Sequence, residues 1–174
     1  MKKIVLSMIA VLAFGFANAQ EQTAKGKWLI EANTGFGAGS NDAKIGNTSF
    51  GLWSSDGNTA WNIGAEAGYF VADNLAVKLG LGYGDDGSDF DSNAFAYKIG
   101  AKYYVVNKFP LEVSYNGVSY EGGYDPSFIG LQGGYAWFLG SNVSLEPGIR
   151  YNVTLDDKVA ESFFQFNVGF ALHF

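Results

Sequence analysis

Eight charged side chains recur at alternating positions of segments that have the composition of β-strands. The four acids and the four bases are Glu31, Glu66, Glu112, Glu146, Lys78, Lys98, Lys102 and Arg150. Since alternate residues of a strand point to the same side, all eight would lie on one face of a sheet with their formal charges in balance. Buried charges are tolerated when they are paired and hydrogen-bonded. The sequence therefore predicts an interior ion-pair network made by these residues.

His173 is the single histidine of the chain and the natural candidate for a catalytic base. Nucleophilic catalysis by serine needs a histidine and an acid arranged around the hydroxyl group. No serine is close to His173 in the sequence, and no G-x-S-x-G motif occurs. A lipid-modifying membrane enzyme is therefore the disfavoured alternative. We expect His173 to be a hydrogen-bonding residue of the interior, and we expect no catalytic residues, no enzymatic activity and no cofactor.

The segment "GDDGSDFDSN" (84–93) is the densest acidic run. It contains Asp85, Asp86, Asp89 and Asp91, and closely spaced carboxylates beside Gly and Ser can bind Ca²⁺. The spacing does not match the EF-hand loop, so these residues are a weak candidate site. Two alternatives stay open: a solvated acidic loop, and divalent ions that bridge the acids to lipopolysaccharide phosphates. The chain has no Cys/His cluster for any other metal.

The elements that must position these groups are eight blocks with a period of two residues. They lie at about 27–38, 59–72, 75–84, 94–106, 111–120, 127–139, 143–154 and 163–174. Short links (73–74, 107–110, 140–142) alternate with long ones (39–58, 85–93, 121–126, 155–162), which is typical of outer-membrane barrels. The pattern predicts an all-β fold, an eight-stranded antiparallel up-and-down transmembrane β-barrel over residues 27–174. We also expect residues 49–55 to extend a hairpin beyond the membrane, and Pro147 to cause a bulge.

Alternation alone does not distinguish this barrel from a soluble one, such as a lipocalin, whose apolar face points inward. Three features favour the membrane barrel. Aromatic residues gather near both ends of the apolar stripes, Gly and Ala separate the charged residues on the polar face, and strands of about ten residues match the hydrocarbon thickness. An eight-stranded barrel is just wide enough to be filled by side chains. The sequence therefore predicts a plugged polar interior, with a narrow ion pathway as the alternative.

The N-terminus carries the signature of a secretory signal peptide over residues 1–19. "MKK" is a basic start, an apolar run follows, and the small residues of "ANA" precede a cleavage site expected after Ala19. A membrane anchor is the alternative interpretation. Residues 20–26 are expected to form a flexible lead. With 17 acidic against 11 basic residues, nucleic acid is excluded as an expected partner, and 0 Cys excludes stabilisation by disulfides.

Three stretches resemble a known family: "GYFVADNLAVKLGLGYG" (68–84), "GGYAWFLGSNVSLEPGIRYN" (133–152) and "FQFNVGFALHF" (164–174). They are similar to the outer-membrane β-barrel domain family, the OmpA/OmpX-like, porin-related small bacterial barrels. The terminal stretch resembles the C-terminal assembly signal that the outer-membrane assembly machinery reads. In this chain that signal would be carried by Phe166, Val168, Phe170, Leu172 and Phe174.

The resemblance implies a location in the bacterial cell outer membrane, and an even strand count then places both termini in the periplasm. The expected partners are outer-membrane lipid, lipopolysaccharide and the assembly machinery, and the chain is expected to be a monomer. The family implies either a structural or surface-interaction role for a barrel with acidic extracellular loops, or a narrow porin-like channel for ions or small solutes.

Overall fold

The structure is a computed structural model that describes residues 22–37, 48, 50–55, 58–85, 93–121, 123 and 125–174. Within these ranges no helix is both long and apolar enough to cross a membrane. The signal peptide predicted over residues 1–19 lies outside the described residues, so that prediction is untested.

Ten strands build the described fold. They are β1 (Trp28–Gly37), β2 (Gly51–Ser55), β3 (Asn58–Ala72), β4 (Leu75–Asp85), β5 (Asn93–Val105), β6 (Phe109–Tyr120), β7 (Ser127–Gly134), β8 (Trp137–Phe138), β9 (Val143–Thr154) and β10 (Phe163–His173). β7 and β8 both pair with β9 in one continuous register. Together they therefore form one strand of the barrel wall, and we call each such wall strand a stave. All eight predicted blocks therefore correspond to staves of the barrel.

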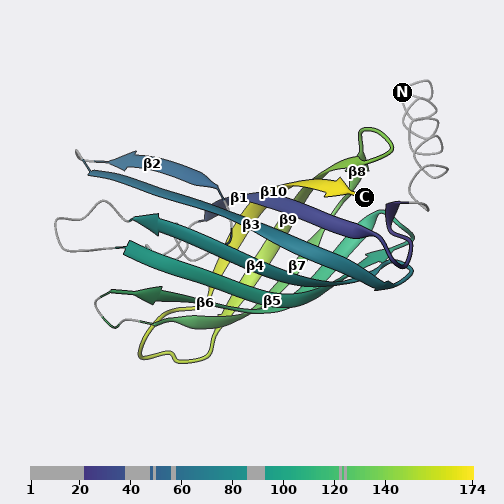
Figure 1. Ribbon diagram of the computed structural model, residues 1–174. Helices are drawn as coiled ribbons and strands as arrows, with labels where there is room; N and C mark the ends of the chain where they lie inside the picture. The colour runs from purple at the N-terminus through teal and green to yellow at the C-terminus, as the bar shows by residue number, and fades with distance from the viewer. Residues whose placement is uncertain are drawn as a thin grey trace, which may run out of the picture.

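The sheet closes on itself, as Figure 1 shows. Each stave pairs antiparallel with its neighbour, from β3 through β9 to β10, and β1 joins β10 to β3. The backbones of Trp28 and Phe174 exchange two hydrogen bonds of 2.9 and 3.1 Å, which continue the β1–β10 ladder to the last residue. The chain is thus a closed eight-stranded antiparallel barrel, and the predicted fold is confirmed. Its C-terminus lies at the end that carries the short turns, here called the short-turn end.

The seam between β1 and β3 is the shortest of the barrel wall. Direct pairing runs from Trp28 opposite Tyr69 to Glu31 opposite Glu66. Beyond this point β2 pairs with β3 from Gly51 to Ser55, and the N–H of Phe50 donates to the carbonyl of Asn33 at 2.8 Å. Figure 1 shows the β2–β3 hairpin extending past the end of β1. The prediction that residues 49–55 extend a hairpin from the first long connection is confirmed for β2.

The two faces of the wall have the predicted orientation. Outward side chains are apolar and exposed, among them Leu79 and Leu81 at 60% each, whereas the adjacent Lys78 is 1% exposed. A soluble protein would not expose a continuous belt of large apolar side chains. Exposed hydrophobic and buried ionic residues together define a barrel of the transmembrane type.

The bulge predicted at Pro147 is wrong. Pro147 lies opposite Val168 in an unbroken β9–β10 register, and the pairing with β7 and β8 keeps one register on either side of it. What Pro147 removes is a hydrogen bond. The N–H of Tyr135 donates to the carbonyl of Pro147 at 3.0 Å, but proline has no N–H to return to Tyr135. β7 therefore ends at Gly134 and β8 begins at Trp137.

The segment before β1 was expected to be a flexible lead, but its described part is held against the short-turn end. The hydroxyl of Thr23 donates to Asn74 Oδ1 at 2.5 Å, the N–H of Asn74 donates back to the carbonyl of Thr23, and Gly26 donates to the carbonyl of Phe70. Gln22 reaches the carbonyl of Gly140 in the β8–β9 turn. Because Gln22 and Thr23 are also buried, this segment bridges two turns rather than hanging free.

Candidate functional site: the ionic interior

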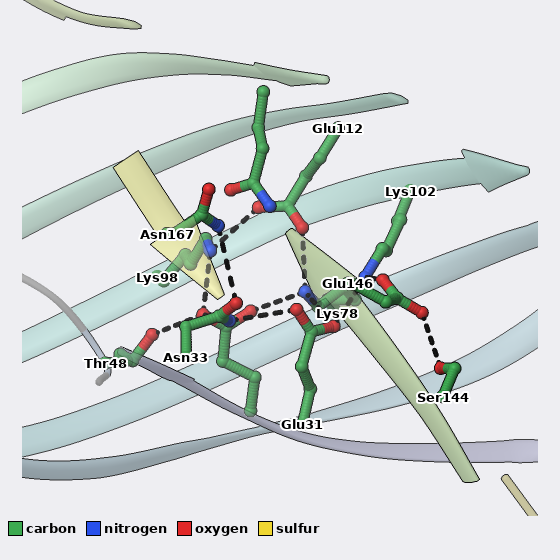
Figure 2. A network of polar contacts seen from close by, with 12 residues as sticks. Glu31, Asn33, Thr48, Lys78, Lys98, Lys102, Glu112, Ser144, Glu146 and Asn167 are labelled. Atoms are coloured by element: carbon green, nitrogen blue, oxygen red, sulfur yellow. Dashed lines mark hydrogen bonds and ion pairs between the residues drawn. The ribbon is translucent and has the colours of Figure 1, made fainter. Parts of the chain in front are cut away.

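Lys78 is the centre of the charge network in the barrel lumen. Its Nζ lies 2.9 Å from Glu31, 2.6 Å from Glu66 and 2.7 Å from Glu112. These three carboxylates come from β1, β3 and β6, so one ammonium group joins walls on different sides of the barrel (Figure 2). Lys78 donates hydrogen bonds to Glu31 and Glu112, and its contact with Glu66 is an ion pair.

The other three bases surround this centre. Lys98 lies 2.7 Å from both Glu66 and Glu112. Lys102 lies 2.7 Å from Glu31 and also contacts Glu146, whose second oxygen accepts from the Tyr104 hydroxyl at 2.9 Å. Through these contacts and that of Arg150 the structure brings together all eight charged residues that the sequence placed on the inner face. Each base contacts at least one carboxylate, and each carboxylate at least one base.

Arg150 lies across the lumen and is almost saturated with acceptors. Its guanidinium contacts Glu112 at 3.1 Å, and donates to Ser114 at 2.6 Å, Asn116 at 2.8 Å and Asn152 at 2.8 Å. The Arg150 guanidinium can occupy this location because Gly130 has no side chain. A Cβ on Gly130 would lie 1.8 Å from Arg150 Nη2, well inside any permitted contact. The glycines of the inner face therefore make room for long charged side chains.

Thr48 belongs to the same network although it lies outside every predicted strand. Its hydroxyl donates to Glu66 Oε1 at 2.6 Å, and the residue is buried (Figure 2). Gly64 and Gly80 provide the space, because a Cβ on either would come within 3.0 Å of Thr48 atoms. The sequence gives no sign of this contact, since an isolated threonine in a long connection has no periodicity.

The short-turn end of the lumen is apolar, which the sequence interpretation missed. Leu29, Phe70, Ala76 and Tyr104 form a buried cluster with Ala136 and Ala171, and Phe138 packs against it. These side chains lie on the short-turn side of the ion pairs, and we call this cluster the apolar floor. The sequence did contain a signal for this cluster, because each of these residues occupies an inward-facing position of the strand alternation near the end of its predicted block.

His173 lies within this apolar floor, and a serine lies beside it. Its Nε2 is 2.9 Å from Ser144 Oγ, because β9 and β10 pair with Ala171 opposite Ser144. No serine is close to His173 in the sequence, but sequence distance does not measure distance across a ladder. The pair is nevertheless not arranged as a triad. Ser144 donates to Glu146 at 2.8 Å, so the acid contacts the serine rather than the histidine.

Access also argues against catalysis at this position. Ser144 and His173 are both buried, and the rings of Phe138, Tyr104 and Phe70 lie 5.4, 6.2 and 6.3 Å from the imidazole ring. A substrate would have to displace the floor of the barrel to reach the hydroxyl. The geometry is that of a packed, hydrogen-bonded interior residue.

The remaining predicted residues are placed as follows. Asp85 ends β4, whereas Asp86, Asp89 and Asp91 lie outside the described residues, so the Ca²⁺ candidate stays a prediction. In the described part of the chain no group of three or more His, Cys, Asp or Glu is placed to hold a metal ion. Phe166, Phe170 and Phe174 of the proposed assembly signal point outward and are exposed.

Comparison with known proteins places this geometry in a class. No family model matches the chain, and no curated protein matches it. Among solved structures, the N-terminal β-barrel domain of Pseudomonas aeruginosa OprF aligns with a TM-score of 0.56 at 14% identity, over 86% of this chain and 98% of that one. A designed transmembrane β-barrel aligns with a TM-score of 0.51 at 14% identity, over 88% and 99%.

These likenesses show the fold. The chain has the architecture of the small outer-membrane β-barrels, and at the level of fold the resemblance inferred from its sequence is confirmed.

Proposed function

We propose that the protein is a non-conducting outer-membrane barrel with a structural or surface-interaction role. The observation that carries the proposal is the packing of the lumen. Four bases and four acids contact one another across it, and side chains of the apolar floor fill its short-turn end. A solute would have to break paired charges in a low-dielectric interior, which costs several kcal/mol for each charge left without a partner.

The proposed setting is the outer membrane of a bacterial cell, with both termini in the periplasm and the barrel as a monomer. Lipid would contact the exposed apolar belt, and the assembly machinery would read Phe166, Val168, Phe170, Leu172 and Phe174 before β10 pairs with its neighbours. Lipopolysaccharide would meet the long connections, where acidic residues gather, through divalent ions. This assignment rests on the barrel fold and on the outward direction of the β10 aromatic residues.

Planar-bilayer recording tests the proposal. The wild-type protein, inserted from detergent, should give no steady and reproducible current steps. Lys98→Ala, which removes a base from the lumen, and Lys158→Ala, which removes an exposed base from the β9–β10 connection, form a matched pair. Steady steps in the wild type that change with Lys98→Ala and not with Lys158→Ala would overturn the proposal in favour of a narrow porin-like channel.

A further inference from the structure

The β5–β6 turn has a backbone that does not suit its sequence. Val106 and Asn107 adopt φ angles of 45° and 62°, in the left-handed region. Asn tolerates this region, but a β-branched residue there is an outlier. Hydrogen bonds within the turn hold this backbone, since the N–H of Lys108 donates to the carbonyl of Val105 at 3.1 Å. The Val106 side chain does not pack in the protein interior and is 61% exposed.

The same turn reverses the usual distribution of polar and apolar side chains. Lys108, two residues beyond Val106, is only 3% exposed, while the valine is 61% exposed. A turn in water would expose the lysine and cover the valine. The reversal is what a turn requires when its outer side meets hydrocarbon rather than water.

Val106 also continues an apolar surface that the fold already assigns to the membrane. The carbonyl of Lys108 accepts from the N–H of Ala136 at 2.7 Å, which brings the turn beside the β8 stave. Phe109, Trp137 and Leu139 are all exposed in the neighbouring staves and turn. We call these residues, with Val106, the apolar rim. On the β3 and β4 side the short-turn end instead presents Asp73, with Lys25 held against it.

We infer that the β5–β6 turn is immersed in the apolar part of the adjacent membrane leaflet, so that the barrel sits deeper on its β5 to β8 side than on its β3 and β4 side. The partner is the acyl chains of phospholipid. This inference rests on the proposed membrane location, and goes beyond it by assigning an asymmetric depth and a lipid contact to a turn.

Site-directed spin labelling tests the immersion, and the absence of native cysteine makes single-label variants straightforward. Val106→Cys is the test position. Leu79→Cys in the middle of the apolar belt and Lys25→Cys on the polar side are the controls. Each nitroxide-labelled protein is placed in phosphatidylcholine vesicles, and its collisions with oxygen and with a water-soluble nickel chelate are compared. The oxygen-to-nickel ratio at position 106 should be severalfold above that at position 25 and approach that at position 79.

A ratio at position 106 equal to that at position 25, with a high ratio at position 79, would overturn the inference and leave the membrane barrel intact. A low ratio at position 79 as well would overturn both the inference and the membrane location. The unmodified protein gives a second readout that is free of any label. In lipid nanodiscs the Val106 methyl groups should show nuclear Overhauser effects to acyl-chain methylene protons, and their absence would also overturn the inference.

Discussion

Arg150 can lie across the lumen because position 130 is a glycine and carries no Cβ. The guanidinium occupies the volume that a side chain on Gly130 would need, and there it contacts Glu112, Ser114 and Asn116. Arg150 is only 2% exposed, so it cannot retreat to water if it is displaced. A residue without a side chain thus contributes to the ion network through the space it leaves.

Gly130→Ala should therefore destabilise the barrel by about 3 kcal/mol or more, since it would leave a buried charge short of partners. Gly133→Ala is the matched control three residues along the same strand. Its new Cβ would meet Leu111 at 3.6 Å, an ordinary contact, and the change should be within about 1 kcal/mol of neutral. Equilibrium unfolding by urea in lipid vesicles measures both, and equal values would contradict the account of the Arg150 site.

Among the strands, β9 carries a built-in gap in its hydrogen-bond ladder. Pro147 accepts from Tyr135 but returns no N–H, and the interruption separates β7 from β8 while the register continues. Close backbone contact accompanies the gap. A Cβ on Gly134 would lie 2.6 Å from the Pro147 carbonyl oxygen, so only glycine fits at this crossing. The ladder lacks a hydrogen bond here although its register is continuous.

Pro147→Val should restore the missing bond, because position 147 faces outward and accepts an apolar side chain. We expect a gain of about 1 kcal/mol in unfolding free energy, the net value of one hydrogen bond. The new amide should also exchange slowly with deuterated water. Ile149→Val, in the same strand and with its N–H retained, should give no gain. A fast-exchanging amide at position 147 would show that the ladder does not close.

For the whole molecule, the decisive property is that the interior charges are buried. The eight residues of the network are at most 7% exposed, and their formal charges sum to zero, while the chain as a whole carries a net charge of −6. Mobile ions screen exposed charges within a Debye length, but they screen buried pairs much less. The contribution of the network to the unfolding free energy should therefore depend little on the salt concentration of the surrounding solution.

Raising NaCl from about 0.1 to about 1 M, which shortens the Debye length from about 10 to about 3 Å, should lower the unfolding free energy by less than about 1 kcal/mol. The measurement is urea unfolding in vesicles of neutral lipid, so that the membrane itself carries no net charge. A loss of several kcal/mol would mean that ions enter the lumen, and it would also weaken the proposal of a non-conducting barrel.

Local periodicity made most of the fold predictable. In β4, Leu79 and Leu81 lie on one face while Lys78 and Gly80 lie on the other, and this alternation can be seen directly in the sequence. The alternation of short and long links identified the staves in the same way. Pro147 was misjudged because a missing donor can be accommodated either by a bulge or by a gap, and only the neighbouring strands decide which.

The sequence by itself determined which side chains of a strand share a face, since strand parity depends on nothing beyond the order of residues. Only the tertiary structure decided which of them meet. Lys78 joins Glu31, Glu66 and Glu112 because barrel closure sets three strands at matching heights. The same closure brings Thr48 to Glu66, and strand pairing brings Ser144 to His173. Such neighbours depend on the register between strands, and no single strand carries that information.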